Sequence, residues 1–268
     1  MSRISSWQPV DLRPDPTRVR GKLRTWRKAW AEAGGEVERS AALTIEYGLA
    51  LIAACDESTN VGKRDAFLVA LGYANLHREM ELADLLVRRL RIHPTGIHVG
   101  TASSKTDQQG KGSSRFIEDR PDLRLVDRAR AWLVVLEELG VGGPDQPVFR
   151  SLTAGGNLRT YPEGRKRGNR MRPGSLNERN LAGKAGLPYI DGRKVTAHSL
   201  RAGANTDMAA VGVPLAERNR VGRWAPGSHT ADTVYDRPHG LAASDPLAKV
   251  PVRPVPVRAL SGVPAGGR

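Results

Sequence analysis

The sequence predicts a mainly α-helical fold with a small antiparallel β-sheet, an α+β arrangement. Apolar residues recur every three or four positions through several long segments, as they do along the buried face of a helix. Between Leu90 and Asp119 this period gives way to short apolar and β-branched runs, which indicate strands. Gly and Pro separate the segments and mark the turns between them.

The first third of the chain is expected to be helical after a flexible lead. Residues 1–20 carry three prolines without a sustained period, so the lead is expected there. Helices are then expected over residues 20–32, 41–54 and 63–76. The Gly34-Gly35 pair separates the first helix from the second.

A strand-rich segment and a further helix are expected next. Three short strands are predicted over residues 90–92, 96–99 and 115–117, with the last two joined across residues 105–112. Asp122 is a candidate N-cap for a helix that runs to Leu139.

The last third of the chain is again expected to be helical. Ser175 and Glu178 form a capping-box pattern that opens a helix, which Gly186 closes. Further helices are expected over about residues 198–211 and 214–221. Ser228 or Thr230 starts a final helix that presents Tyr235, and a disordered tail is expected beyond Pro238.

The composition favours a polyanionic partner, nucleic acid first. The 268 residues include 42 Lys and Arg against 28 Asp and Glu, a formal net charge of +14 at pH 7. Nine of the basic residues are lysine and 33 are arginine, whose guanidinium group binds phosphate oxygens in pairs. A GC-rich genome would raise the arginine content in the same way.

Several classes of protein are not indicated. Cys55 is the single cysteine, so neither an internal disulfide nor a cysteine-rich metal site can form. The sequence lacks a secretory signal segment and a run of the ~20 apolar residues that span a bilayer. It also lacks zinc-ligand spacing, a P-loop and a dinucleotide fingerprint. A soluble cytoplasmic protein without a metal or cofactor is expected.

Four residues near the end of the predicted fold suggest phosphodiester chemistry. His198 and Arg201 lie three apart, so on a helix they share one face and can grip one small anion. Trp224 offers an indole N–H, and Tyr235 offers a phenol that needs a neighbour to accept its proton, because phenols ionise near pH 10. A helical His-x-x-Arg alone is a common chance occurrence, and the order of the whole set carries the argument.

This order resembles the catalytic C-terminus of the tyrosine recombinase (phage integrase) family, over roughly residues 38–237. The resemblance implies that Arg78 and Arg201 flank a scissile DNA phosphate and that Tyr235 attacks it, leaving a 3'-phosphotyrosine. Glu81 would be the acidic partner of Arg78, where an ordinary surface ion pair is the alternative. Lys105 best matches the lysine that protonates the leaving hydroxyl, and Lys111 competes for that role. His198 would exchange a proton with the tyrosine or donate to the phosphate.

Two departures from the family pattern stand out. The His or Trp of the family lies about nine residues before the Tyr, whereas Trp224 and Tyr235 are eleven apart. We call the place of this His or Trp, between the His-x-x-Arg pair and the Tyr, the third position. Arg223 and His229 are therefore alternatives to Trp224 for it. Fewer than 40 residues precede the predicted catalytic domain, where the family usually carries a DNA-clamping helical domain.

The predicted organisation has three parts. Residues 1–37 form a basic lead, a possible remnant of that clamping domain; residues 38–240 form the catalytic domain; residues 241–268 form the tail. A basic loop over residues 150–173 suits DNA backbone phosphates, with a disordered insertion as the alternative. Its DNA-binding candidates are Arg159, Arg165, Lys166, Arg167, Arg170 and Arg172.

The resemblance implies a site-specific recombinase or integrase that acts on double-stranded DNA as a homo-oligomer, a tetramer, and is nucleoid-associated when bound. It implies no metal or nucleotide, because the phosphotyrosine bond conserves the energy of the broken ester. A catalytically impaired DNA-binding remnant or accessory protein of an integrative element is the alternative from another class. A topoisomerase of related mechanism is a third.

Overall fold

The computed structural model describes residues 15–35, 39–101, 113–161, 169–171, 178–196 and 198–236. The chain divides into two compact units, Met1–Arg39 and Ser40–Arg268. The boundary of 37 and 38 expected from the sequence stays a prediction. The predictions for Lys105, Lys111, the capping box at Ser175 and the tail beyond residue 236 concern positions outside the described residues.

The first unit contains one described helix, α1 (Pro16–Glu32). It begins four residues before the expected start at Arg20, so the flexible lead predicted over residues 1–20 is wrong for its last residues. The reason is local: the Asp15 carboxylate accepts the Thr17 N–H at 2.9 Å, and Pro16 suits the first helical position because that position needs no N–H.

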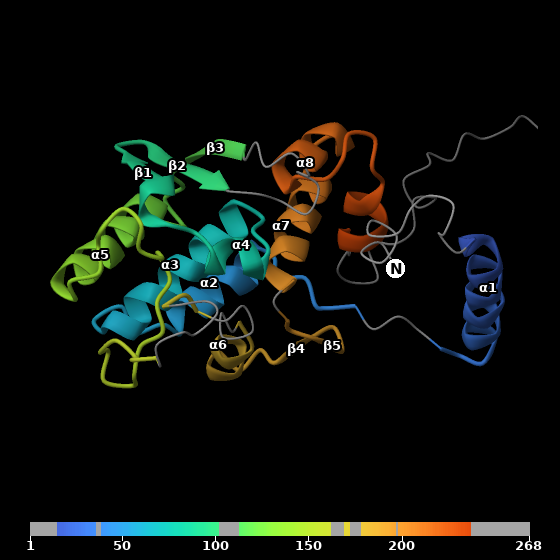
Figure 1. Ribbon diagram of the computed structural model, residues 1–268, viewed down its shortest axis with the longest axis horizontal. Coiled ribbons are helices and arrows are strands. Elements are labelled where there is room, and N and C mark those ends of the chain that lie inside the picture. The colour runs from blue at the N-terminus through green and yellow to red at the C-terminus, as the bar shows by residue number, and fades with distance from the viewer. Residues whose placement is uncertain are drawn as a thin grey trace, which may run out of the picture. The chain divides into compact units, whose positions relative to one another are not determined.

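The second unit is built around α3 (Asn60–Ala74), which packs against α2 (Ile45–Ala53), α5 (Leu125–Glu138) and α7 (Ser199–Ala210) (Figure 1). Most of the apolar positions that predicted α2, α3 and α5 are buried, with Phe67, Leu71 and Trp132 at 0% exposure. Shorter helices complete the unit: α4 (Glu79–Ala83), a 3-10 turn (Val87–Arg89), α6 (Glu178–Lys184) and α8 (Leu215–Gly222). Across the part of the chain that is described, none of these helices combines the length and apolarity needed to cross a membrane.

The start of α2 differs from the prediction. Residues 41–44, expected to be helical, are extended and buried. The Ala41 N–H donates to the Lys194 carbonyl and the Leu43 N–H to the Ser199 carbonyl, each at 2.9 Å. These long-range backbone contacts replace the helical hydrogen bonds that the apolar spacing predicted.

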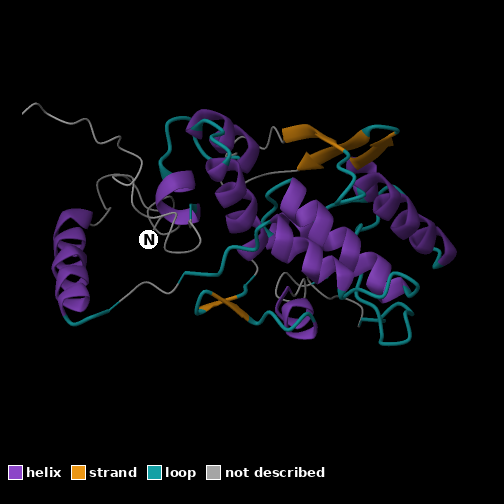
Figure 2. Ribbon diagram, turned by 180° about the vertical axis from the view of Figure 1, so that it is seen from behind, coloured by secondary structure: helices purple, strands orange, loops and turns teal. Residues whose placement is uncertain are grey.

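The predicted sheet is confirmed. Strands β1 (Leu90–His93), β2 (Gly96–Thr101) and β3 (Ser113–Glu118) are antiparallel in the order β1-β2-β3. Leu90 pairs with Val99, and Ile97 with Ile117, so one face of the sheet is apolar and buried. α5 packs against β1 and β2, and both views place the sheet along one side of the helices (Figures 1 and 2).

The N-cap predicted for α5 is wrong. Asp122 lies before the helix, where it accepts the Leu123 N–H at 2.8 Å and pairs with Arg120. Asp119 instead accepts the Leu125 N–H at 2.6 Å, because Arg124 in a left-handed conformation turns the chain back towards it.

The C-terminal elements carry the residues of interest. Strands β4 (Tyr189–Ile190) and β5 (Arg193–Lys194) form a small hairpin before α7. After α8 the described chain ends in one π-helical turn, Ala231–Tyr235, rather than a longer helix. π-helical turns are rare in proteins, and those that occur often lie at functional sites.

Gly203 allows α7 to approach the extended residues before α2. A Cβ on Gly203 would lie 1.6 Å from the Leu43 carbonyl oxygen, so Gly203→Ala must separate the two segments. We expect a loss of about 2 kcal/mol or more in the free energy of unfolding, measured by urea denaturation. Gly183→Ala is the matched control: Gly183 is exposed in α6 with nothing within 4 Å, and its substitution should be neutral or stabilising. Equal effects of the two substitutions would contradict this packing role.

Candidate active site

The turn after α3 collects two arginines that are remote in sequence. Leu76 follows the helix with a left-handed φ of 48°, which turns its carbonyl away from the helix axis. This carbonyl accepts from Arg201 Nη1 at 2.5 Å and from Arg223 Nη2 at 3.1 Å. Arg223 Nη1 also binds the Asn75 carbonyl at 3.0 Å. Carbonyls at the end of a helix lack helical partners and carry its partial negative charge, so guanidinium groups are suitable donors.

Glu81 joins Arg78 to Arg223 and so to the contacts at Leu76. We call Arg78, Glu81, Arg201 and Arg223 the cluster. Arg78 precedes α4, and its backbone N–H donates to Glu81 Oε2 at 2.9 Å while its Nη1 donates to Oε1 at 2.7 Å. Arg223 Nη2 reaches Oε2 at 2.7 Å from the other side. The Glu81 side chain is only 5% exposed, so the pair is buried rather than an ordinary surface ion pair. The structure therefore brings together Arg78 and Arg201, which the sequence places 123 positions apart.

The cluster holds more positive than negative charge. Burial alone would raise the pKa of Glu81, but the Arg223 charge and the Arg78 N–H lower it to about 2. Burial lowers the pKa of Arg201 to about 9, and the Arg78 charge acts in the same direction, so the group stays charged at neutral pH. Burial also lowers the pKa of His77 to about 3, which leaves that ring neutral. Two guanidinium groups thus pair with one carboxylate while a third, that of Arg201, binds the neighbouring Leu76 carbonyl, an arrangement whose excess positive charge suits an anion.

Arg201 lies against the rings of Trp224 and Tyr235. Its Cζ is 4.3 Å from the Trp224 ring centroid and 5.3 Å from that of Tyr235, and the two rings are 5.1 Å apart. Stacking of this kind is favourable because the ring face is electron-rich. Arg201 Nη2 also donates to the Gly222 carbonyl. A Cβ at Gly222 would lie 2.1 Å from the Trp224 ring, so glycine is needed for the indole to occupy this place.

Arg201 has a buried donor to offer. The residue is 0% exposed, and its Nε has no hydrogen-bond partner among the residues that the structure describes. An unsatisfied buried donor is costly, so an acceptor at this point would be bound favourably. The rings of Trp224 and Tyr235 lie against the buried guanidinium.

The three candidates for the third position are separated by the structure. Trp224 is buried against both Arg201 and Tyr235. Arg223 binds Glu81 and the turn after α3. His229 is exposed, and its backbone carbonyl accepts from Thr233 within the last turn of the described chain. This geometry favours Trp224 beside the phenol and gives Arg223 a separate place in the cluster.

The other predicted residues are less closely joined to the cluster. His198 is exposed at the start of α7, one turn before Arg201. Its backbone N–H donates to Thr196 Oγ1 at 3.2 Å. In the basic loop, Arg159 Nε donates to the Leu152 carbonyl at 3.0 Å, and Arg170 lies 3.6 Å from Asp84. The remaining DNA-binding candidates lie outside the described residues: Arg165, Lys166, Arg167 and Arg172.

Sequence reasoning missed the backbone carbonyls that hold the cluster and the part played by Arg115. Arg115, from β3, donates to the Ala74 carbonyl at 3.2 Å and to Asn75 Oδ1 at 3.4 Å. Burial and then the Arg223 charge lower its pKa to about 10. Every residue has a backbone carbonyl, so residue types do not reveal which carbonyls bind the arginines. The only sequence feature that indicated free carbonyls here was the expected end of a helix just before Arg78. No group of three or more metal-ligating side chains occurs within the described ranges.

Glu81→Gln should remove an acid-sensitive part of the stability. The folded pKa of Glu81, about 2, lies below the ordinary 4.5, so its contribution is present above that value and is lost as the pH falls towards 2. We expect Glu81→Gln to cost about 3 kcal/mol at neutral pH, with the difference from wild type shrinking below about pH 4.5. Urea denaturation across this range measures the difference, and Glu217→Gln, at an exposed position of α8, is the control. A difference independent of pH would contradict the charge-based role.

The chain is similar in sequence to a curated recombinase. The chain is 29% identical over 196 residues to an integrase/recombinase XerD homolog from Selenomonas ruminantium, covering 70% of this chain. It spans about half of that relative, 52% of its length. No protein-family model matches the sequence.

Solved structures agree in fold. The structure of XerA recombinase matches with a TM-score of 0.53 and 17% identity, over 89% of this chain and 77% of that one. A XerH site-specific recombinase bound to its palindromic difH substrate, in a post-cleavage complex, matches with a TM-score of 0.50 and 16% identity. That match covers 74% of this chain and 50% of the other. The predicted fold is confirmed: the chain shares the fold of these recombinase structures.

Proposed function

We propose that this chain cuts and rejoins double-stranded DNA at specific sites through a 3'-phosphotyrosine on Tyr235. The observation that carries the proposal is the guanidinium of Arg201, which lies against the Tyr235 ring and is joined through Leu76 and Glu81 to Arg223 and Arg78. The XerD homolog supports it through sequence similarity.

The proposed reaction is a pair of transesterifications. The Tyr235 oxygen attacks the scissile phosphorus, a P–O bond forms, and the bond to the 5'-oxygen breaks. Charge accumulates on the non-bridging oxygens, and Arg78 and Arg201 are the preorganised cations that stabilise it. Attack by a 5'-hydroxyl reverses the step and restores the phenol. The ester energy is kept in the phosphotyrosine, so the mechanism calls for no nucleotide.

The remaining candidates take the proton and contact roles. His198 accepts the phenol proton or donates to the phosphate, Trp224 offers its indole N–H, and Lys105 protonates the leaving 5'-oxygen. Arg223 is not a rival in this scheme, because its Glu81 and Leu76 contacts hold the other two arginines together. Assembly as a homo-tetramer on DNA and nucleoid association stay predictions of the family resemblance.

The covered state of Arg201 defines the first step. Since the guanidinium is fully buried under Trp224 and Tyr235, the phenol ring must turn aside before the phosphate enters. Tyr235 ends the π-helical turn, which Thr206 holds by donating to the Tyr235 carbonyl at 3.2 Å. The ring can thus move while the backbone stays attached to α7.

Tyr235→Phe should abolish covalent attachment to DNA. The test is denaturing electrophoresis after incubation with a duplex library in which a 5'-bridging phosphorothiolate traps the intermediate. The sulfur leaves without a proton, so the outcome does not depend on Lys105. Wild type and Tyr189→Phe, a control at a tyrosine that is 60% exposed on β4, should form the adduct. An adduct that persists in Tyr235→Phe would contradict the role of the nucleophile. DNA binding without any adduct in wild type would favour the impaired accessory protein.

Trp224→Ala and His229→Ala should separate the candidates for the third position. Because Trp224 contacts both Arg201 and Tyr235, its loss should slow adduct formation by about 100-fold or more. His229→Ala should change the rate by less than about 3-fold, as an exposed substitution does. Rates of trapping on the same phosphorothiolate duplexes measure both. The reverse order of effects would assign the position to His229.

A further inference from the structure

The exposed face of the β1–β2–β3 sheet carries arginine, histidine and serine side chains in neighbouring cross-strand rows. The register pairs Arg91 with His98 and His98 with Phe116, while Gly100 pairs with Ser114. Because side chains alternate along a strand, these residues share the face opposite the buried apolar one. None of them belongs to the cluster around Arg201.

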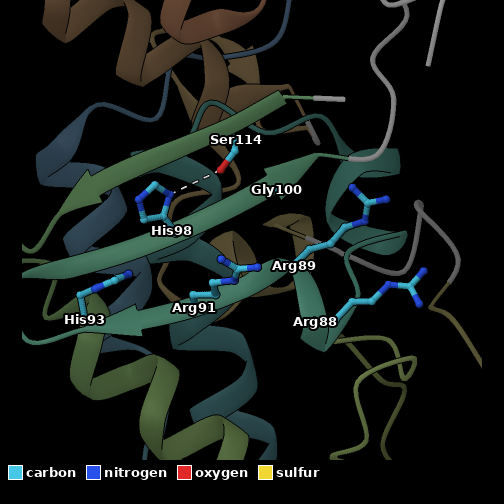
Figure 3. Close-up of a pocket in the computed structure, with 7 residues that line it drawn as sticks. All are labelled: Arg88, Arg89, Arg91, His93, His98, Gly100 and Ser114. Carbon is cyan, nitrogen blue, oxygen red and sulfur yellow. Dashed lines mark hydrogen bonds between the residues drawn. The ribbon is translucent and has the colours of Figure 1, made fainter. Parts of the chain in front are cut away.

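This face of the sheet contains a depression. A depression of about 430 Å³ is lined by Arg88, Arg89, Arg91, His93, His98 and Ser114, with Gly100 as its floor. Arg89 precedes β1 but joins the face, because its Cβ and Cγ lie over Gly100. Figure 3 shows these side chains on one side of the sheet, with helices behind it. We call Arg88, Arg89, Arg91, His98 and Ser114 the sheet-face basic patch.

The patch has unbalanced positive charge. Arg88 pairs with Asp145, but neither Arg89 nor Arg91 has an acidic partner among the described residues. No acidic side chain lines the depression. Glu118 shares the face and lies in the same cross-strand row as His93, through Gly96, but it does not line the depression. A solvated sheet face commonly mixes both signs of charge, so two adjacent uncompensated guanidinium groups indicate an anionic ligand.

The neutral groups at the patch suit phosphate oxygens better than nucleobases. His98 Nδ1 lies 3.4 Å from Ser114 Oγ, so an imidazole and a hydroxyl stand beside the arginines. The rings of His93, His98 and Phe116 pack on each other with centroids 5.3 to 5.8 Å apart. The rings therefore pack on one another beside the arginines, and these mutual contacts occupy ring faces that a nucleobase would need for stacking.

We propose that the sheet-face basic patch binds backbone phosphates of duplex DNA outside the reacting site. Guanidinium forks bind phosphate oxygens in pairs, and such contacts position a protein on DNA without reading its sequence. The opposite face of β3 reaches the active cluster through Arg115 and Asn75, so one strand joins the two sites. The proposal goes beyond the proposed function, because it requires phosphate binding and not cleavage.

The test is the salt dependence of binding to a fluorescent duplex of arbitrary sequence, measured by anisotropy between about 50 and 200 mM salt. Arg89→Gln and Arg91→Gln should each weaken binding and lower the slope of log affinity against log salt by about 1. Arg130→Gln is the matched control with the same charge change, because Arg130 is exposed on α5 away from the patch. It should leave the slope within error of wild type.

Further arms separate the possible ligands. Thermal unfolding of each variant confirms that it is folded, and binding in the Tyr235→Phe background keeps the result independent of cleavage. Slopes for Arg89→Gln and Arg91→Gln equal to that of Arg130→Gln would overturn the proposal. So would losses confined to single-stranded DNA or to a polyglutamate peptide, which would assign the patch to unpaired bases or to an acidic protein segment. Competition by inorganic phosphate as strong as that by duplex would assign it to free anions.

Discussion

Two guanidinium groups share the carbonyl oxygen of Leu76, and the candidate active site depends on this contact. The carbonyl is available because α3 ends at Ala74 and Leu76 takes a left-handed conformation that few side chains adopt. Arg201 arrives from α7 and Arg223 from the end of α8, so one backbone atom fixes the relative position of three elements. Together with the Gly222 carbonyl, it holds the Arg201 guanidinium against the rings of Trp224 and Tyr235.

Glu81 stabilises the cluster, and the excess positive charge of the arginines allows the cluster to bind an anion. Two arginines on one buried carboxylate satisfy that group fully, while a third guanidinium lies nearby with a buried Nε that has no partner in the described part of the chain. Concentrating positive charge in a buried place is unfavourable for folding and favourable for binding an anion. The nucleophile candidate covers this charge in the present structure, which couples entry of the phosphate to movement of Tyr235.

The sequence predicted the elements better than their ends, and the residues better than their contacts. Apolar spacing located α3 and α5, and the change of period located the sheet, because both patterns follow from burial of one face. The predicted start of α2 was wrong because the Leu43 N–H donates to the Ser199 carbonyl instead of forming a helical hydrogen bond. The predicted N-cap of α5 was wrong because Arg124 turns the chain towards Asp119. The proximity of Arg78 and Arg201 came from family resemblance alone. The carbonyls of Asn75 and Leu76 could not be read from residue types at all.

A crystal structure of the chain with vanadate, a five-coordinate mimic of a reacting phosphate, tests the central claim most directly. The account predicts vanadium bound between the side chains of Arg78 and Arg201, with the Tyr235 ring turned away from Arg201 and its oxygen completing the coordination. Vanadate bound elsewhere, with Arg201 still covered by Trp224 and Tyr235, would contradict it.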